Sequence, residues 1–114
     1  MKKAPPLLSE AFIPVYPSLS TRYGVCGAMI IAQVHFMCYQ KANDKAGYRW
    51  CYNSYAQWSE LLPFSAMTIR RTMKDLELDG VIIAASYNRH GWDKTKWYRV
   101  CYEQLDLIKL NIPP

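Results

Sequence analysis

The chain lacks an uninterrupted apolar run long enough to cross a lipid bilayer. Its longest apolar stretch, from about Val25 to Tyr39, is interrupted by Gln33 and His35 and falls short of the roughly 20 residues that a spanning helix requires. At the start of the chain, two lysines are followed by prolines and an acidic residue instead of the apolar segment of a signal peptide. We therefore expect a cytoplasmic protein with no membrane span.

Ligands for a metal ion are few and widely spaced. The histidines are His35, in an apolar segment, and His90, beside a glycine. None of the cysteines belongs to a CxxC pair; they are Cys26, Cys38, Cys51 and Cys101. In a reducing compartment such isolated cysteines are free thiols that pack like small hydrophobic side chains. The sequence therefore predicts no metal site, and it contains no motif for another cofactor.

Motifs for catalysis are also missing. The sequence contains no glycine-rich phosphate loop, no HExxH, no GxSxG, and no cysteine with a suitably placed histidine. The carboxylates of Asp75, Glu77 and Asp79 gather at one predicted helix end, where repulsion and solvation are the expected outcome. The sequence therefore favours a non-enzymatic function.

Apolar and aromatic residues, in contrast, are abundant. Hydrophobic residues make up 51% and aromatic residues 14% of the positions, which is enough for the core of one domain. With 114 residues, the chain is too short for two domains. The 14 lysines and arginines outnumber the nine acidic residues and give a net charge of +5. This excess permits a polyanionic partner, and the placement of the charges must decide whether one binds.

The first 20 residues are rich in proline and predict an extended arm. The arm is expected to pack through Phe12, Ile13, Val15 and Tyr16. Ser20 and Thr21 are candidate caps for a helix over 21–41, where apolar residues recur at intervals of three and four. Because this helix is apolar nearly all round, it predicts burial on more than one side, by the domain itself or by a second copy in a homodimer.

A polar turn over 43–47 follows, and the aromatic segment over 48–52 predicts a short strand. Asn53 or Ser54 can cap a short helix that ends before Pro63.

Ser65 can cap a second helix over 66–79, and Gly80 can close it. The segments 81–87 and 96–102 then predict the two strands of a hairpin, with asparagine, glycine and aspartate in the loop between them.

The order of helix, strand, two helices, strand, long loop and strand is that of a winged helix-turn-helix domain, an α+β fold. We expect three helices, a short strand and a C-terminal β-hairpin whose loop forms the wing. The domain would occupy residues 21–104, between the arm at 1–20 and a short C-terminal tail at 105–114.

The helix over 66–79 is the predicted recognition helix. On a helical wheel Ile69, Met73 and Leu76 face inward, and the outward face carries cations near the start of the helix. Arginine at such positions can form bidentate contacts with guanine in the major groove, while a basic wing would contact phosphates. The predicted DNA-binding residues are Ser65, Met67, Thr68, Arg70, Arg71, Lys74, Asn88, Arg89, His90, Lys94 and Lys96. The alternative is an ordinary solvated helix face.

The four tryptophans and nine tyrosines could stack on single-stranded bases, but such residues more often build the core. Trp50, Trp58 and Trp97 have apolar neighbours and are expected to pack inside. Trp92 lies in the predicted wing tip, where it either folds back under the hairpin or contacts a partner.

Taken together, several segments are similar to winged-helix replication proteins of bacterial phages and mobile elements. The matching residues are Trp50-Cys51-Tyr52-Asn53-Ser54-Tyr55, Trp58, Pro63-Phe64-Ser65, Thr68-Ile69-Arg70-Arg71, Leu76-Glu77, Gly80, Tyr87-Asn88 and Asp93-Lys94-Thr95-Lys96-Trp97-Tyr98, with Pro17-Ser18-Leu19 and Gln33-Val34-His35-Phe36 upstream. The resemblance covers about residues 15 to 105. It implies a double-stranded DNA-binding protein of replication initiation or replisome organisation, with 68–71 at the start of the recognition helix and 88–96 as the wing.

Two other functions remain open. A small transcriptional regulator would use the same basic surface. A protein-interaction module, with a replisome component or another protein as partner, would instead use the exposed apolar residues Met67, Leu78 and Trp92, or the segment 105–112.

Overall fold

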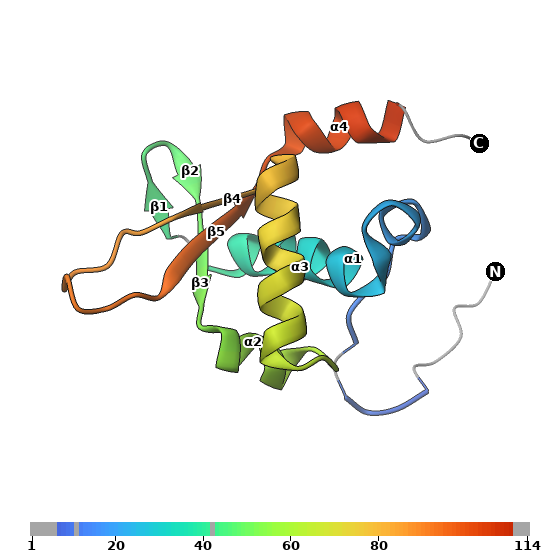
Figure 1. Ribbon diagram of the computed structural model, residues 1–114, viewed down its shortest axis with the longest axis horizontal. Coiled ribbons are helices and arrows are strands. Elements are labelled where there is room, and N and C mark those ends of the chain that lie inside the picture. Colours follow the sequence, from blue (N-terminus) through green and yellow to red (C-terminus); the bar gives the residue numbers. More distant parts are fainter. Residues whose placement is uncertain (1–6, 11, 42, 111–114) are drawn as a thin grey trace.

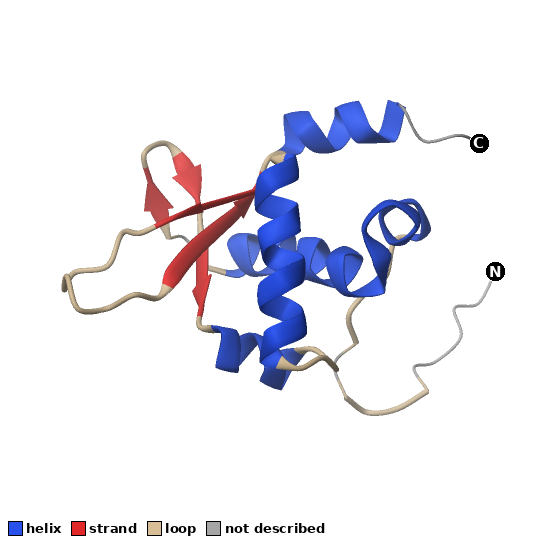
Figure 2. Cartoon of the chain, viewed as in Figure 1, coloured by secondary structure: helices blue, strands red, loops and turns tan. Residues whose placement is uncertain are grey.

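The computed structural model describes residues 7–10, 12–41 and 43–110. Within these ranges the chain is a mixed α+β domain with four helices and two small antiparallel sheets (Figure 1, Figure 2). In chain order the elements are α1 (Pro17–Gln40), β1 (Asp44–Lys45), β2 (Tyr48–Arg49), β3 (Cys51–Asn53), α2 (Tyr55–Leu61), α3 (Ala66–Asp79), β4 (Ile82–Ala85), β5 (Lys96–Val100) and α4 (Tyr102–Leu110).

The larger sheet has the strand order β3-β5-β4, and both pairings are antiparallel. Side chains alternate across β5, so that Tyr98 and Val100 are buried in the core, whereas Trp97 and Arg99 lie on the outer face. Helix α1 packs against β5 and helix α3 against β4, which covers the inner face. The largest fully buried side chains are Trp58, Tyr98, Ile30, Ile69, Met73, Leu76, Ile82, Val34 and Val81.

Helix α1 begins earlier than the sequence predicts. Tyr16 is its N-cap and Pro17 its first residue, so the predicted cap Thr21 lies inside the helix and its hydroxyl donates to the carbonyl of Pro17 at 3.0 Å. Proline suits this position because the first helical N–H has no partner within the helix. Gly24 then interrupts the helical backbone with φ 78° and ψ 170° and kinks the helix.

The domain itself buries the middle of this helix and leaves its flanks exposed, and burial of the flanks by a second copy in a homodimer stays a prediction. Ile30, Ile31 and Val34 are buried, but Phe36 and Tyr39 are 53% and 63% exposed. The predicted packing of the arm is correct only in part. Ile13 packs against the core, whereas the other three apolar side chains named for it, Phe12, Val15 and Tyr16, are exposed.

The two central helices agree closely with the sequence. Ser54 caps α2, since its hydroxyl accepts from the backbone N–H of Gln57 while the Gln57 side chain accepts from the N–H of Ser54. Ser65 caps α3, and Gly80 closes it in the left-handed conformation with φ 85°. Asn53, the other candidate cap, is instead buried at the end of β3.

The strands are shorter and more broken than predicted. The expected strand over 48–52 is divided between β2, which pairs with β1 in a two-stranded hairpin, and β3, which pairs with β5. The expected turn over 43–47 therefore contains β1. β4 and β5 end before the predicted limits of 87 and 102.

The count of three helices is wrong, because α4 occupies the predicted end of the last strand and most of the predicted tail. The backbone N–H of Cys101 donates to the carbonyl of Val81 and continues the ladder, and the carbonyl of Cys101 then accepts from Leu105 in the first turn of the helix. Two tertiary contacts hold this turn: Leu105 packs against the core, and the Gln104 amide donates to the carbonyl of Asp79 at 3.1 Å. None of the helices in the described ranges has the length and apolar character that crossing a bilayer requires.

Candidate nucleic-acid interface

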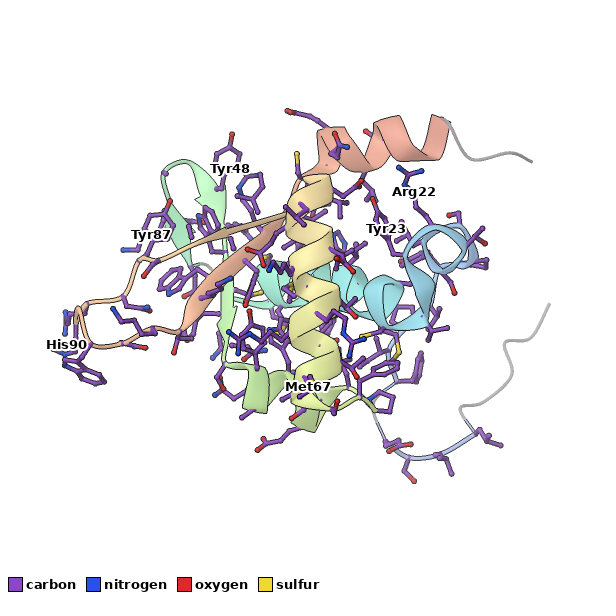
Figure 3. The ribbon with its side chains drawn as sticks, in the orientation of Figure 1. Arg22, Tyr23, Tyr48, Met67, Tyr87 and His90 are labelled. Atoms are coloured by element: carbon purple, nitrogen blue, oxygen red, sulfur yellow. The ribbon has the colours of Figure 1, made fainter. Side chains whose placement is uncertain are left out.

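Helix α3 presents one apolar face and one polar face, as the helical wheel predicts. Ile69, Met73 and Leu76 are fully buried. The exposed residues predicted for the outward face are Met67, Arg70, Arg71, Lys74 and Leu78. Met67 lies at the first turn of the helix, at the end remote from α4 (Figure 3).

The polar residues at the start of α3 are occupied by the helix itself. The hydroxyl of Ser65 accepts from the backbone N–H of Thr68 at 3.2 Å and donates to the hydroxyl of Thr68 at 3.0 Å. The Ser65 hydroxyl therefore caps the helix and stays at the surface, and the Thr68 hydroxyl is its hydrogen-bond acceptor.

The charges of α3 are divided between its two ends. Arg70 lies 5.8 Å from the ring centroid of Tyr55, and among the described residues no carboxylate forms an ion pair with Arg70, Arg71 or Lys74. Near the other end, Glu77 pairs with Lys96 at 3.4 Å. The first half of the helix therefore keeps free positive charge at its surface.

Asp79, the last residue of α3, is similarly engaged. Its carboxylate accepts a hydrogen bond from the hydroxyl of Tyr23 and lies 3.9 Å from the guanidinium of Arg22. Burial, together with the bond to the carboxylate, raises the pKa of Tyr23 to about 12. Figure 3 shows Arg22 and Tyr23 on the side of α1 that faces the C-terminal end of α3 and α4. The acidic end of α3 is thus tied to α1 and does not oppose the free cations at the other end.

The loop over 86–95, which joins β4 to β5, is held together by Asn88. The amide nitrogen of Asn88 donates to the carbonyls of Asp93 at 2.9 Å and Thr95 at 2.7 Å, and its oxygen accepts from the indole of Trp97 at 2.8 Å. Asn88 is half-buried. Its side chain therefore shapes the loop.

Charged and aromatic side chains project from the tip of this loop. His90 stacks on Trp92, with ring centroids 5.2 Å apart and an angle of 9° between the planes. Trp92 is 77% exposed, so it does not fold back under the hairpin. Arg89 and Lys94 are also exposed, and Figure 3 shows His90 at the end of the loop farthest from the helices.

Aspartate stabilises the turn at this tip. The carboxylate of Asp93 accepts from the backbone N–H of Thr95 at 3.0 Å, and hydrogen bonding to Thr95 lowers the pKa of Asp93. The loop therefore holds a defined turn beneath its exposed cations.

Lys96 occupies a different place from the other predicted loop cations. It stands at the start of β5, and its ammonium group pairs with Glu77 of α3. This ion pair is exposed and links the start of β5 to α3. Lys96 would have to leave Glu77 to bind a phosphate directly.

The three tryptophans expected to pack inside differ in burial. Trp50 and Trp58 are buried, as predicted. Trp97 is only half-buried and lies on the outer face of the sheet beside Tyr52 and Tyr87, which the sequence analysis did not single out. The strand alternation at 96–100 was the available signal, because it separates Trp97 from the inward Tyr98.

The cysteines in the described ranges are free thiols, with Cys38 and Cys51 buried and Cys26 and Cys101 half-buried. Hydrogen bonding between the two buried thiols, more than their desolvation, raises the pKa of Cys51. In the part of the chain that the structure describes, no three histidine, cysteine or acidic side chains group as metal ligands.

Comparison of the chain with family models, with curated proteins and with solved structures yields no match. Any function of this surface must therefore be argued from its geometry and charge.

Proposed function

We propose that this domain is a winged helix-turn-helix module that binds double-stranded DNA, with α3 in the major groove and the 86–95 loop on the DNA backbone. The observation that carries the proposal is the set of cations Arg70, Arg71 and Lys74 on the exposed face of α3, none of which pairs with a carboxylate of the described residues. The element order and the β3-β5-β4 sheet support the winged-helix assignment. Helix α3 packs against β4 of this sheet, and a long loop joins β4 to β5.

Each cation has a distinct task in this proposal. Arg71 reads a base edge, for which a planar guanidinium is suited, and Arg70 and Lys74 flank it. Arg89 and Lys94 at the loop tip contact phosphates or enter the minor groove. Ser65, Thr68 and Asn88 keep these groups in position through their hydrogen bonds within the chain, and Lys96 does the same through Glu77.

Replication initiation in a phage or mobile element is the context that the sequence resemblance favours. A transcriptional regulator would use the same surface and is distinguished by the DNA site it selects.

A protein-interaction module is the second candidate function. Met67, Leu78 and Trp92 are 73%, 78% and 77% exposed, and large apolar side chains at such exposure are typical of partner contacts when they gather in a patch. Here they lie at the start of α3, at its end and at the loop tip. This separation favours the DNA proposal over an apolar interface.

Fluorescence anisotropy of a labelled random-sequence duplex tests the proposal. Binding should weaken by at least about tenfold between roughly 50 and 200 mM salt, because cations on the protein displace counterions from phosphates. Arg71→Ala should cost about 1–3 kcal/mol on a selected site and relax its base preference.

A matched pair of variants separates location from net charge. Arg71→Ala/Lys74→Ala and Lys41→Ala/Lys45→Ala each remove two exposed cations. The first should abolish most duplex binding and the second should change it little. Equal losses would mean that only net charge matters, and no duplex binding at the lower salt would reject the proposal in favour of a protein partner.

A further inference from the structure

A continuous row of aromatic and guanidinium groups lies along the outer side of the three-stranded sheet. In spatial order its members, which we call the aromatic row, are Tyr48, Arg99, Trp50, Tyr87, Trp97 and Tyr52. The guanidinium carbon of Arg99 lies 3.6 Å from the ring centroid of Tyr48 and 5.5 Å from that of Trp50. From Trp50 to Tyr52 the successive ring centroids are 5.1, 5.5 and 5.0 Å apart.

The strand register explains why Tyr52, Trp97 and Arg99 share one face. Tyr52 of β3 is the direct partner of Trp97 in β5, and Arg99 lies two positions further along the same face of β5. On the other side, Trp97 is paired with Ala85 of β4, whose methyl group is too small to cover an indole. In the described part of the chain, helices α1 and α3 lie against the inner face and so do not cover these rings.

The row borders solvent along most of its length. Tyr48 and Tyr52 are 51% and 45% exposed, and Tyr87, Trp97 and Arg99 are half-buried above the buried Trp50. The hydroxyls of Tyr48 and Tyr52 have no hydrogen-bond partner among the described residues. Figure 3 shows Tyr48 and Tyr87 at the end of the molecule that carries the sheet, away from Met67 of α3.

Positive charge lies at one end of the row. Arg49 and Arg99 line a hollow of about 260 Å³ together with Tyr39 and Tyr48, and Glu103 is the acidic residue on its wall. Arg49 also lies 3.9 Å from the carboxylate of Asp44, so Arg99 is the cation here without an ion pair among the described residues. The Nε of Arg99 is buried and donates to no described residue. No carboxylate in the described ranges forms an ion pair with Arg99. Since Arg99 as a whole is half-buried, the accessible part of its guanidinium can face a phosphate group at this hollow.

We infer that the outer face of the sheet binds single-stranded nucleic acid, with bases stacked on the accessible rings of Tyr48, Trp97 and Tyr52 and a backbone phosphate beside Arg49 and Arg99. Base stacking on aromatic side chains, combined with nearby cations, is the general chemistry of such binding. A row that extends from β2 to the start of the 86–95 loop suits several consecutive bases better than one nucleotide. The inference is independent of the duplex proposal, because it uses none of the cations of α3.

The first measurement uses the unmodified protein and an oligothymidine of about 15 nucleotides, a length in the range of known single-strand sites. Stacking on Trp97, next to Trp50, should quench tryptophan fluorescence, and anisotropy of the labelled oligomer should rise at about 50 mM salt. No quenching and no anisotropy change would overturn the inference. Equal quenching by thymidine monophosphate at the same nucleotide concentration would also overturn it, because the site would then be a mononucleotide pocket.

Variants then locate the site. Tyr48→Ala/Tyr52→Ala should weaken oligothymidine binding by at least about fivefold for each ring removed, whereas Tyr48→Phe/Tyr52→Phe should bind like the parent, because the rings and not the hydroxyls stack. Tyr16→Ala removes a tyrosine of similar exposure, 52%, from the start of α1 and should have no effect. Parent-level affinity in the alanine pair would reject the sheet as the site.

A cross-comparison keeps this inference separate from the duplex proposal. The Arg71→Ala/Lys74→Ala protein should lose duplex binding and keep oligothymidine binding, and the Tyr48→Ala/Tyr52→Ala protein should show the reverse. Loss of oligothymidine binding in the α3 variant would assign both ligands to α3 and overturn the inference. If the parent protein binds oligothymidine but no duplex, the duplex proposal fails and this inference stands.

Discussion

At the scale of single residues, Trp58 combines complete burial with an unsatisfied polar atom. Its indole Nε1 has no hydrogen-bond partner among the described residues, and its ring packs edge-on against Tyr98 with centroids 6.1 Å apart. A buried donor left without a partner costs about 1–3 kcal/mol, which offsets part of what the ring contributes.

We therefore expect Trp58→Phe, which keeps an aromatic ring and removes the N–H, to lower the free energy of unfolding by less than about 2 kcal/mol. Trp58→Ala should lower it by about 3–5 kcal/mol, because it leaves a large cavity. Urea denaturation of the three proteins measures both values. Equal losses of unfolding free energy in Trp58→Phe and Trp58→Ala would show that the indole nitrogen contributes a favourable interaction.

Asn88 is the residue on which the 86–95 loop depends most. Asn88→Ala removes its bonds to the carbonyls of Asp93 and Thr95 and leaves the indole N–H of Trp97 without its acceptor. Trypsin should then cleave faster after Arg89 and Lys94, while global stability falls by about 1–3 kcal/mol. Ser86→Ala, which removes a longer bond of 3.3 Å to the same amide, is the control and should leave the cleavage rate near that of the parent.

The sequence predicts the exposure of single residues better than their bonds. The 100° periodicity of α3 correctly separates the buried Ile69 from the exposed Arg71. The same reasoning treats Asn88 and Thr68 as free polar groups, yet both are used within the chain. The partners of Asn88 lie in the loop and on β5, whose positions only the folded chain defines, so residue type and spacing alone could not reveal them. The partner of Thr68 is the predicted cap Ser65 three residues earlier, so local spacing does contain that signal.

At the scale of elements, Gly24 and Gly80 each bound a helical segment, but they differ in the substitutions that they tolerate. Gly80 closes α3 with φ 85° and ψ 2°, a left-handed conformation that asparagine also adopts. Gly24 kinks α1 with φ 78° and ψ 170°, a region that is almost restricted to glycine. A Cβ at Gly24 would meet no atom within 4 Å, so the penalty there is conformational and not steric.

Gly24→Asn should therefore destabilise the protein by about 1–3 kcal/mol, and Gly80→Asn by only a few tenths. Thermal unfolding of the two variants gives the comparison. A similar small effect at both positions would mean that α1 straightens at Gly24 with little cost to its packing.

Elements with strong local signals are those that the sequence predicts well. Helices α2 and α3 have serine caps, and α3 has a closing glycine, so their starts and ends follow from local chemistry. Helix α4 has no comparable signal, because its nine residues follow directly on a strand pattern and its first turn is held by contacts with α3 and the core. The hairpin of β1 and β2 is too short for any periodicity to appear.

At the scale of the whole molecule, the burial of Tyr23, together with its hydrogen bond to Asp79, couples stability to pH. The pKa of Tyr23 is raised from 10.0 to about 12, so folding favours its protonated form. That stabilisation is complete below pH 10, where the unfolded tyrosine is also protonated, and it is lost as the pH rises from about 10 to 12.

Tyr23→Phe should be less stable than the parent by about 1 kcal/mol at pH 8, and the difference should shrink between about pH 10 and 12. Urea denaturation at several pH values measures this trend. Tyr52→Phe, which changes an exposed tyrosine, should match the parent throughout. A constant difference between Tyr23→Phe and the parent would show that the hydroxyl bond does not control the alkaline loss.

The β3-β5-β4 order also sets the sequence of events by which the domain forms. β4 and β5 are joined by one loop, and α2 and α3 by a few residues, so these pairs meet soon after collapse. β3 precedes α2 yet pairs with β5, which means that the whole chain between them must close before this ladder can form. The β3 edge is therefore the last part of the sheet to assemble, and nascent chains that have not yet released β5 from the ribosome leave β3 without its partner.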